Sequence, residues 1–192
     1  LINIVKRASE RVYIPITIGG GIRTLDDTRE LLKVGADKVV INTEATKNPE
    51  LIRNTANMFG SQCVVVSVEA KRVGNSKWEA YADHGREPTG LDVVEWVKRA
   101  QELGAGEILL TSVDADGTEG GFDMELIRSV SEVVSVSLVV SGGAGSIADF
   151  VQCINECNVD GVAAGSMFHH RRYSIKEIKE ELHKKGFPVR HS

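Results

Sequence analysis

Short apolar runs and amphipathic segments alternate along the chain. The runs are rich in β-branched residues and broken by glycine or polar residues, which predicts strands. They cover residues 13–18, 38–42, 63–68, 108–113, 138–140 and 162–164. A segment with helical spacing of its apolar positions follows each run, although residues 71–86 first form a predicted hairpin with its turn at 74–76. This alternation predicts right-handed crossovers and a parallel α/β sheet.

Capping residues and glycines define the expected ends of the helices. The first helix begins after Thr24 or Asp26, either of which can cap it, and ends before Gly35. The last helix is capped by Ser174 and ends at Gly186. The helices between them are predicted at residues 49–59, 91–103, 124–134 and 147–157.

The chain contains an internal repeat. Residues 140–166 resemble residues 17–43 without a gap when Gly19 is aligned with Gly142, an offset of 123 residues. Each copy consists of a strand, a glycine turn, a helix, an aspartate, a second strand and a hydroxyl residue. A repeat of this length indicates a symmetric architecture.

The repeat favours a (βα)8 TIM barrel with internal two-fold symmetry over an open doubly wound sheet. Neither GGGI nor SGGAG spells the dinucleotide fingerprint that a Rossmann fold carries. A complete barrel has about 250 residues, more than the 192 of this chain. Shifting the two middle strands back by the repeat offset places two further strands before residue 1. We therefore expect residues 1–192 to form a single barrel domain made of units three to eight, without the first two βα units.

The composition is that of an ordinary soluble domain. Hydrophobic residues make up 42% and charged residues 26% of the chain, enough to bury a core. No apolar run approaches the roughly 18 residues of a membrane span and no signal-peptide layout is present, so we expect a cytoplasmic protein without a membrane partner. The net charge of −4 gives no reason to expect nucleic acid. We expect Cys63, Cys153 and Cys157 to be buried thiols rather than metal ligands.

The carboxyl ends of the predicted strands carry the candidate binding residues, because parallel barrels place their active sites on this face. Glycines at these ends let backbone N–H groups approach a phosphate, and Thr43 and Ser166 add hydroxyls. The repeat creates two such groups, here called the first and second phosphate sites, which suit a substrate with a phosphate at each end. The alternative is that the glycines only make tight turns. If they bind phosphate, Gly143→Val should raise KM and leave the fold intact.

Three carboxylates, Glu69, Asp114 and Asp116, end apolar strands between these two sites. Partial desolvation there can tune a carboxylate for proton transfer. Two alternatives remain: Asp116 precedes a glycine and can serve a turn, and Glu69 can form a salt bridge with the nearby Lys71 or Arg72. At the opposite ends of the strands, two oppositely charged residues, at positions 38 and 107, can stabilise the barrel or form a gate.

Motifs along the whole chain resemble the cyclase subunit of imidazole glycerol phosphate synthase, a (βα)8 barrel of histidine biosynthesis. They are IGGGI, GADKVVINTEA, NPELI, FGSQCVVVSVEAKRV, GAGEILLTSVDADGT, GFDMELI, SGGAG, MFH and PVR. The resemblance implies a bisphosphorylated ribulosyl aminoimidazole carboxamide as substrate. It also implies a glutaminase partner at the amino-terminal face of the barrel, whose ammonia closes an imidazole ring and releases an aminoimidazole carboxamide ribotide. It implies no metal or organic cofactor.

The resemblance also implies roles for individual residues. The first phosphate site would comprise Gly20, Gly21, Asn42 and Thr43. The second would comprise Asp116, Gly117, Gly142, Gly143, Gly165 and Ser166. The candidate catalytic residues are Glu69, Asp116 and Thr111. Lys38 and Glu107 match a charged gate at the entrance for ammonia.

One residue departs from the family pattern. The family uses two catalytic aspartates, of which the first would precede residue 1 and the second corresponds to Glu69. A displacement of about 1 Å, such as one extra methylene produces, can cost on the order of 100-fold in rate. Two other functions therefore stay open. One is a paralogue that channels glutaminase-derived ammonia to an amidotransferase for surface-polysaccharide sugars, and the other is a module that binds bisphosphorylated metabolites without catalysis.

Overall fold

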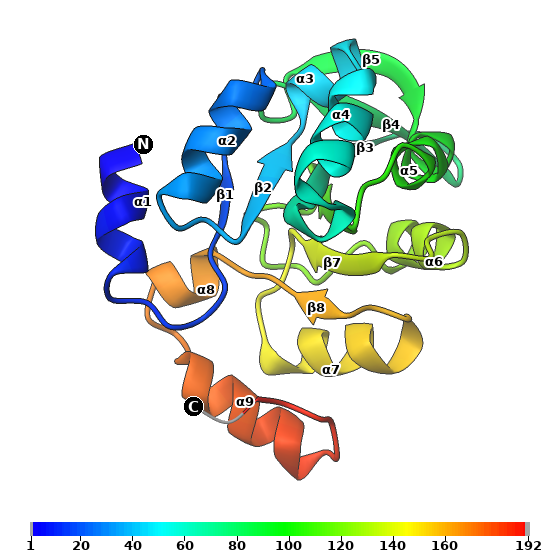
Figure 1. The fold of residues 1–192 in the computed structure, drawn as a ribbon. Helices are drawn as coiled ribbons and strands as arrows, with labels where there is room; N and C mark the ends of the chain where they lie inside the picture. The colour runs from blue at the N-terminus through cyan, green and yellow to red at the C-terminus, as the bar shows by residue number, and fades with distance from the viewer. Residues whose placement is uncertain (1, 191–192) are drawn as a thin grey trace.

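A computed structural model describes residues 2–190, and its centre is a curled parallel sheet with helices on the outer side (Figure 1). The parallel strands follow one another in chain order as β1 Thr17–Gly19, β2 Lys38–Ile41, β3 Val64–Gly74, β6 Glu107–Ser112, β7 Ser137–Ser141 and β8 Gly161–Val162. This arrangement is a partial barrel, so the predicted α/β fold with a parallel sheet is confirmed to that extent. Among residues 2–190, no helix combines the length and apolar character that a membrane crossing requires.

The helices lie before β1, in the connections between the parallel strands, and after β8. They are α1 Ile2–Ser9, α2 Leu25–Lys33, α3 Thr43–Lys47, α4 Glu50–Phe59, the 3-10 turn Ser61–Cys63, α5 Val93–Glu102, α6 Met124–Ser131, α7 Ile147–Glu156, α8 Ser166–His169 and α9 Ile175–Lys184. The sequence did not predict α1, α3 or α8. Two of these helices, α3 and α8, are too short to show a helical apolar period. The third, α1, has apolar residues at half of its positions, INIVKRAS, and its amphipathic pattern was overlooked.

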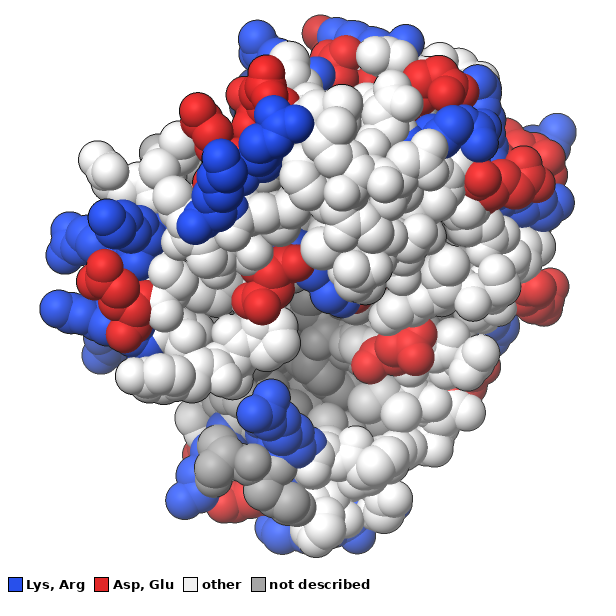
Figure 2. All heavy atoms as spheres, viewed as in Figure 1, with Lys and Arg blue, Asp and Glu red and all other residues white. Residues whose placement is uncertain are grey.

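Burial differs between the two faces of the sheet. Side chains that point outward under the helices are almost completely buried, as Val39, Ile108 and Leu138 are, each with no exposed area. Their neighbours Leu109 and Val139, which point the other way, are only half-buried. The concave face is therefore the less buried one. Figure 2 shows the surface in the view of Figure 1, with a hollow near its centre.

The two copies of the repeat are equivalent in structure, but their alignment contains one inserted residue. Thr17 pairs with Lys38 in the first copy, and Val139 pairs with Gly161 in the second, so the offsets are 122 for the first strand and 123 for the second. The gap-free alignment was therefore wrong. Three consecutive glycines in the first copy hid the shift, because any of them can be matched to Gly142.

The corrected alignment also matches backbone conformation. Gly20 and Gly21 correspond to Gly142 and Gly143, and all four have positive φ, at 104°, 74°, 91° and 105°. The capping boxes agree, since Thr24 and Asp27 cap α2 as Ser146 and Asp149 cap α7. The extra residue of the second copy thus lies after its capping box, within the helix and the turn that follows.

The predicted strand at residues 13–18 was largely wrong. Only Thr17–Gly19 forms β1, and the preceding Tyr13 and Ile14 are 90% and 60% exposed. Pro15 cannot donate a hydrogen bond to a neighbouring strand, and among the described residues β1 pairs only with β2. Apolar character alone therefore overestimated the strand.

The predicted hairpin exists and is larger than expected. β3 continues to Gly74, β4 spans Lys77–Ala82, and a third antiparallel strand, β5, spans Glu87–Asp92. The turn between β3 and β4 is where the sequence predicts it. The third strand takes the residues expected to open the next helix, which begins at Val93 because the Asp92 side chain accepts from the N–H groups of residues 94 and 95.

A charged cluster anchors this hairpin to α6. The Arg72 guanidinium lies 2.8 Å from Glu125 and 3.1 Å from Asp123. It also stacks on the Trp78 ring at 4.5 Å, and the Trp78 indole N–H donates to Asp123. Hydrogen bonds from Ser76 and then Arg72 lower the pKa of Glu125, and the bond with Glu125 raises the pKa of Arg72. The cluster therefore favours the ionised carboxylate.

This cluster predicts a pH-dependent contribution to stability from Glu125. Because the pKa of Glu125 is lowered in the folded state, its contribution is fully present above the usual value of 4.5 and is lost as pH falls through the folded pKa. Glu125→Gln should therefore reduce the free energy of unfolding more at about pH 6 than at about pH 3. Urea unfolding at both pH values measures this, with the exposed Glu132→Gln as control. Equal losses at both pH values would contradict the assignment.

Candidate functional site

The carboxyl ends of β1, β2 and β3 open into a cavity of about 600 Å³. It gathers residues that the sequence assigns to the first phosphate site and to catalysis, namely Gly20, Gly21, Asn42, Thr43 and Glu69. The sequence therefore predicted this group from residues that are as far apart as positions 20 and 69.

The turn at Gly20 and Gly21 exposes its backbone to the cavity. Both residues have positive φ, and a Cβ added to either would meet no atom within 4 Å. The capping box fixes the turn, since Asp27 accepts hydrogen bonds from the N–H groups of Arg23 at 2.9 Å and Thr24 at 2.8 Å. The bond from Arg23 is the main cause of the lowered pKa of Asp27. A phosphate can thus approach the backbone here without steric hindrance.

Asn42 and Thr43 add side-chain groups to the same cavity. The Asn42 Oδ1 atom is buried and has no hydrogen-bond partner among the described residues. Such an atom is costly to leave unpaired, so it suits a hydroxyl or ammonium donor on a ligand. The Thr43 hydroxyl accepts from the Asp83 N–H at 3.1 Å and can still donate its own proton.

Three basic side chains that the sequence analysis missed line this cavity. Arg23 follows the glycine turn, Lys47 ends α3, and His84 lies in the loop between β4 and β5. Arg23 could have been found because it comes two residues after Gly21. Nothing local marked Lys47 or His84, because the fold brings them in from other elements. Arg23 and Lys47 supply cations and His84 an N–H donor to a cavity that already offers backbone donors, and the carboxylates of Glu44, Glu69 and Asp83 line the same cavity.

Glu69 lies at the boundary between the first phosphate site and the rest of the sheet. Its Oε2 atom accepts a hydrogen bond from the Gly85 N–H at 2.8 Å, and it pairs in register with Thr111 of β6. The alternative of a salt bridge was wrong within residues 2–190, because Arg72 pairs with α6 and Lys71 lies over the Tyr81 ring. The carboxylate is therefore held by a neutral backbone donor.

Thr111 and Asp114 differ in their surroundings. Thr111 is half-buried on the concave face and pairs in register with Ser141 of β7 as well as with Glu69. The Asp114 carboxylate accepts from the Arg72 N–H at 2.7 Å, which ties the end of β6 to the hairpin. Asp114 therefore has a structural partner, whereas Thr111 shares its level of the sheet with the candidate acid.

The residues of the second phosphate site lie at the ends of β6, β7 and β8, and none of them lines the cavity that contains Glu69. Asp116 is exposed in a turn in which its N–H donates to the Ser112 carbonyl. Ser166 begins α8 directly after Gly165. Gly117 and Gly165 have no atom within 4 Å of an added Cβ, so their backbones are accessible.

Gly142 and Gly143 serve the packing of the protein itself. The Gly121 N–H donates to the Gly143 carbonyl at 2.8 Å, and a Cβ on Gly143 would lie 2.1 Å from the Gly121 carbonyl oxygen. A Cβ on Gly142 would lie 2.7 Å from the Ser112 carbonyl oxygen. The expectation that Gly143→Val leaves the fold intact was therefore wrong, because the loop after β6 occupies the required space.

Lys38 and Glu107 meet at the opposite end of the strands. Their side chains form an ion pair at 2.5 Å, with 31% and 14% of the side chains exposed. Glu107 pairs in register with Val65, and Lys38 begins the strand on the other side of β3. The structure thus brings together the two residues that the sequence assigns to a charged gate.

Comparison with protein families gives one assignment. The model of the family described as histidine biosynthesis protein matches residues 1–174. The chain belongs to this family. The match includes the first cavity, the Lys38–Glu107 pair and the residues of the second phosphate site, and it ends before α9 begins. The histidine biosynthesis family consists of enzymes with barrel-like α/β folds, in agreement with the curled sheet.

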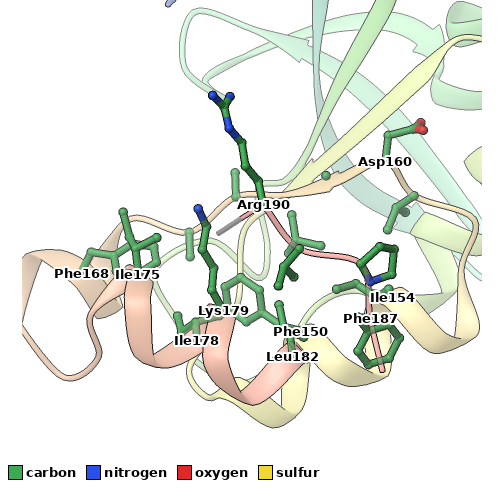
Figure 3. A pocket seen from close by; sticks show the side chains of 17 residues that line it. Phe150, Ile154, Asp160, Phe168, Ile175, Ile178, Lys179, Leu182, Phe187 and Arg190 are labelled. Atoms are coloured by element: carbon green, nitrogen blue, oxygen red, sulfur yellow. The ribbon is translucent and has the colours of Figure 1, made fainter. Parts of the chain in front are cut away.

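A second cavity of this histidine biosynthesis family member, of about 580 Å³, lies between β8, α7, α9 and the carboxyl-terminal segment (Figure 3). Its labelled lining residues are largely apolar, and Lys179 and Arg190 extend away from the apolar floor around Leu182. The Asp160 carboxylate at its edge already accepts from the Leu138 N–H at 2.8 Å. The polar side chains of this cavity therefore lie around an apolar floor, whereas the first cavity combines a glycine turn, basic side chains and the Glu69 carboxylate.

None of the three cysteines of this family member lines the first or the second cavity. Cys153 and Cys157 are buried, as expected, and burial raises the pKa of Cys153 to about 12 and also raises that of Cys157. The expectation of a buried thiol was wrong for Cys63, which ends the 3-10 turn and is only partly buried. Within residues 2–190, no group of three or more His, Cys, Asp or Glu side chains is arranged to hold a metal ion.

Proposed function

We propose that this chain is the ammonia-dependent cyclase and lyase subunit of imidazole glycerol phosphate synthase. The observation that carries the proposal is a single cavity in which an accessible glycine turn, three basic side chains and the Glu69 carboxylate meet. Backbone donors and positive charge suit a phosphate, and a carboxylate beside them suits proton transfer at a group attached to that phosphate. The membership in the histidine biosynthesis family supports the same reaction class.

In this proposal, the first phosphate site orients the substrate and Glu69 moves the proton. Gly20, Gly21 and Thr43 bind one phosphate, while the unpaired Asn42 Oδ1 accepts from a hydroxyl on the adjoining sugar carbon. The Gly85 N–H fixes one Glu69 oxygen and leaves the other free to take a proton from the attacking nitrogen and return it to the leaving group. The second phosphate site holds the other end of the substrate.

The amino-terminal ends of the parallel strands support a proposed glutaminase partner. Val12, Tyr13 and Ile14 are 39%, 90% and 60% exposed, and they precede the start of β1. Lys38 and Glu107 begin β2 and β6 at the same end of the parallel sheet. An exposed apolar patch beside a charged pair is suited to a partner that delivers ammonia at that point.

Lys38→Met tests the proposed gate. Removal of the ammonium group leaves Glu107 without its partner, so we expect turnover with glutamine and the glutaminase subunit to fall by about 10-fold, as a barrier about 1.4 kcal/mol higher would cause. Turnover with free ammonium should be retained, because the first cavity, at the carboxyl ends of the strands, is unchanged. Steady-state kinetics with each nitrogen source measure the difference. Equal losses with both sources would mean that the pair only stabilises the fold.

One assay tests the proposed reaction. The protein is given ammonium and the bisphosphorylated ribulosyl aminoimidazole carboxamide, and the loss of this substrate is followed. Turnover supports the cyclase. Tight binding without turnover would overturn it and leave a binding function.

A paralogue that channels ammonia for surface-polysaccharide sugars is the second candidate, favoured by Glu69 at the position of the family's aspartate. A Glu69→Asp variant that gains cyclase activity would support this candidate, because the shorter acid would then restore a function that the natural residue lacks. A Glu69→Asp variant that loses activity would instead support the cyclase with a glutamate as its acid.

A further inference from the structure

The loop between β4 and β5, residues 83–86, adds a feature that the proposed function does not explain. Asp83 and His84 have φ values of 49° and 59°, and Gly85 follows with 74°. Asp and His are among the non-glycine residues that adopt the left-handed region most readily, and hairpin loops commonly use it. The conformation therefore fits the turn between β4 and β5, and its functional interest lies in what the loop places at the first cavity.

Two backbone donors hold this loop over the first cavity. The Asp83 N–H donates to the Thr43 hydroxyl at 3.1 Å, and the Gly85 N–H donates to Glu69 Oε2 at 2.8 Å. A Cβ on Gly85 would lie 3.0 Å from Val113, so the loop also rests on the end of β6. The residue between the two donors is His84, and it lines the same cavity as the Gly20–Gly21 turn.

We infer that His84 is a further phosphate-binding residue of the first site, presented by the loop between β4 and β5 to the anion that the Gly20–Gly21 turn holds. An imidazole carries an N–H donor in either of its protonation states, and a hydrogen bond to a charged phosphate is stronger than one to a neutral group. The inference rests on the phosphate site of the proposed function. It adds to that site a contact from the hairpin of β4 and β5, which lies outside the two copies of the repeat.

The charged groups around the loop are of both signs. The cations at the cavity are Arg23 and Lys47, and Lys47 also lies 3.9 Å from Glu87 at the far end of the loop. Three acids line it as well: Glu69, which accepts from the loop backbone, Asp83, which lies 3.9 Å from Arg86, and Glu44. An anion at the glycine turn would therefore rely on directed donors, namely the turn backbone, the two cations and the His84 imidazole, and not on a net positive cavity.

The test uses inorganic phosphate as the probe and NMR of the full chain as the readout. Phosphate is added while the histidine Cε1–H signals and the backbone amide signals of Gly20 and Gly21 are followed. The signal that disappears in His84→Asn identifies His84. Asn accepts the left-handed conformation, so the loop should be retained, and the Gly85 amide signal checks this. His169→Asn, at an exposed position outside this cavity, is the matched control.

We expect the His84 signal to shift over the same phosphate range as the two glycine amides. His84→Asn should weaken phosphate binding at the glycine turn by about 10-fold, and His169→Asn should not. If the glycine amides shift and the His84 signal does not, the phosphate site stands and the inference about His84 is wrong. If neither set of signals shifts, the first site does not bind phosphate, and both the proposed phosphate site and the inference about His84 are wrong.

Discussion

Glu69→Gln is expected to reduce ammonia-dependent turnover by about 100- to 10,000-fold, the usual contribution of a positioned acid or base. The amide oxygen of glutamine can still accept from the Gly85 N–H, so the loop over the cavity is retained. The variant cannot transfer a proton at neutral pH. The expected result is therefore a loss of kcat with little change in KM, because the groups that bind phosphate are unchanged.

Two further variants distinguish proton transfer from support of the loop. Glu69→Asp keeps a carboxylate but shortens it, so its hydrogen bond to Gly85 at 2.8 Å would be stretched. Thr111→Val removes a hydroxyl at the same level of the sheet without altering the acid. Steady-state kinetics with ammonium measure all three. If Glu69→Gln keeps its kcat, the carboxylate serves only the loop and the proposed catalytic role is wrong.

The sequence predicts the parallel sheet well because its signals are local and repeated. Apolar runs and capping residues specify the alternation, and Thr24 and Ser174 cap their helices as expected. The sequence identified the repeated strand, turn and helix, but it aligned the first half of the two copies one residue out of register. Glycine identity could not resolve that shift, whereas the pairing of Thr17 with Lys38 does.

The sequence could predict only those residues of the candidate site that lie at the carboxyl ends of predicted strands. Gly20, Thr43 and Glu69 follow this rule and share one cavity. His84 and Lys47 do not, because a third hairpin strand and a short helix bring them there. The position of a side chain on an inserted hairpin depends on tertiary contacts, such as the cluster around Arg72, that no local pattern reveals.

In the second phosphate site, each glycine must be assigned separately to ligand binding or to packing of the protein. Gly143 has φ of 105° and lies against the Gly121 carbonyl, whereas Gly165 has φ of −114° and open space around an added Cβ. Any side chain is disfavoured at the first position for reasons of strain and overlap. A side chain added at Gly165 would contact only a ligand bound there.

Gly143→Ala should lower the free energy of unfolding by about 3 kcal/mol or more, because the backbone is left-handed and the added Cβ would lie only 2.1 Å from the Gly121 carbonyl oxygen. That loss is a large fraction of the roughly 5–15 kcal/mol of a typical domain. Gly165→Ala should change the free energy of unfolding by less than about 0.5 kcal/mol. It should nevertheless raise KM by about 10-fold, because the methyl group keeps the phosphate from the backbone.

Urea unfolding and steady-state kinetics on both variants separate the two roles. A destabilised Gly143→Ala protein beside a stable Gly165→Ala protein with raised KM would assign packing to the first glycine and binding to the second. If Gly165→Ala leaves KM unchanged, the turn before α8 does not contact the substrate. The internal symmetry would then extend to the backbone of the two copies but not to their function, and phosphate binding would belong to the Gly20–Gly21 copy, where both glycines are open to the cavity.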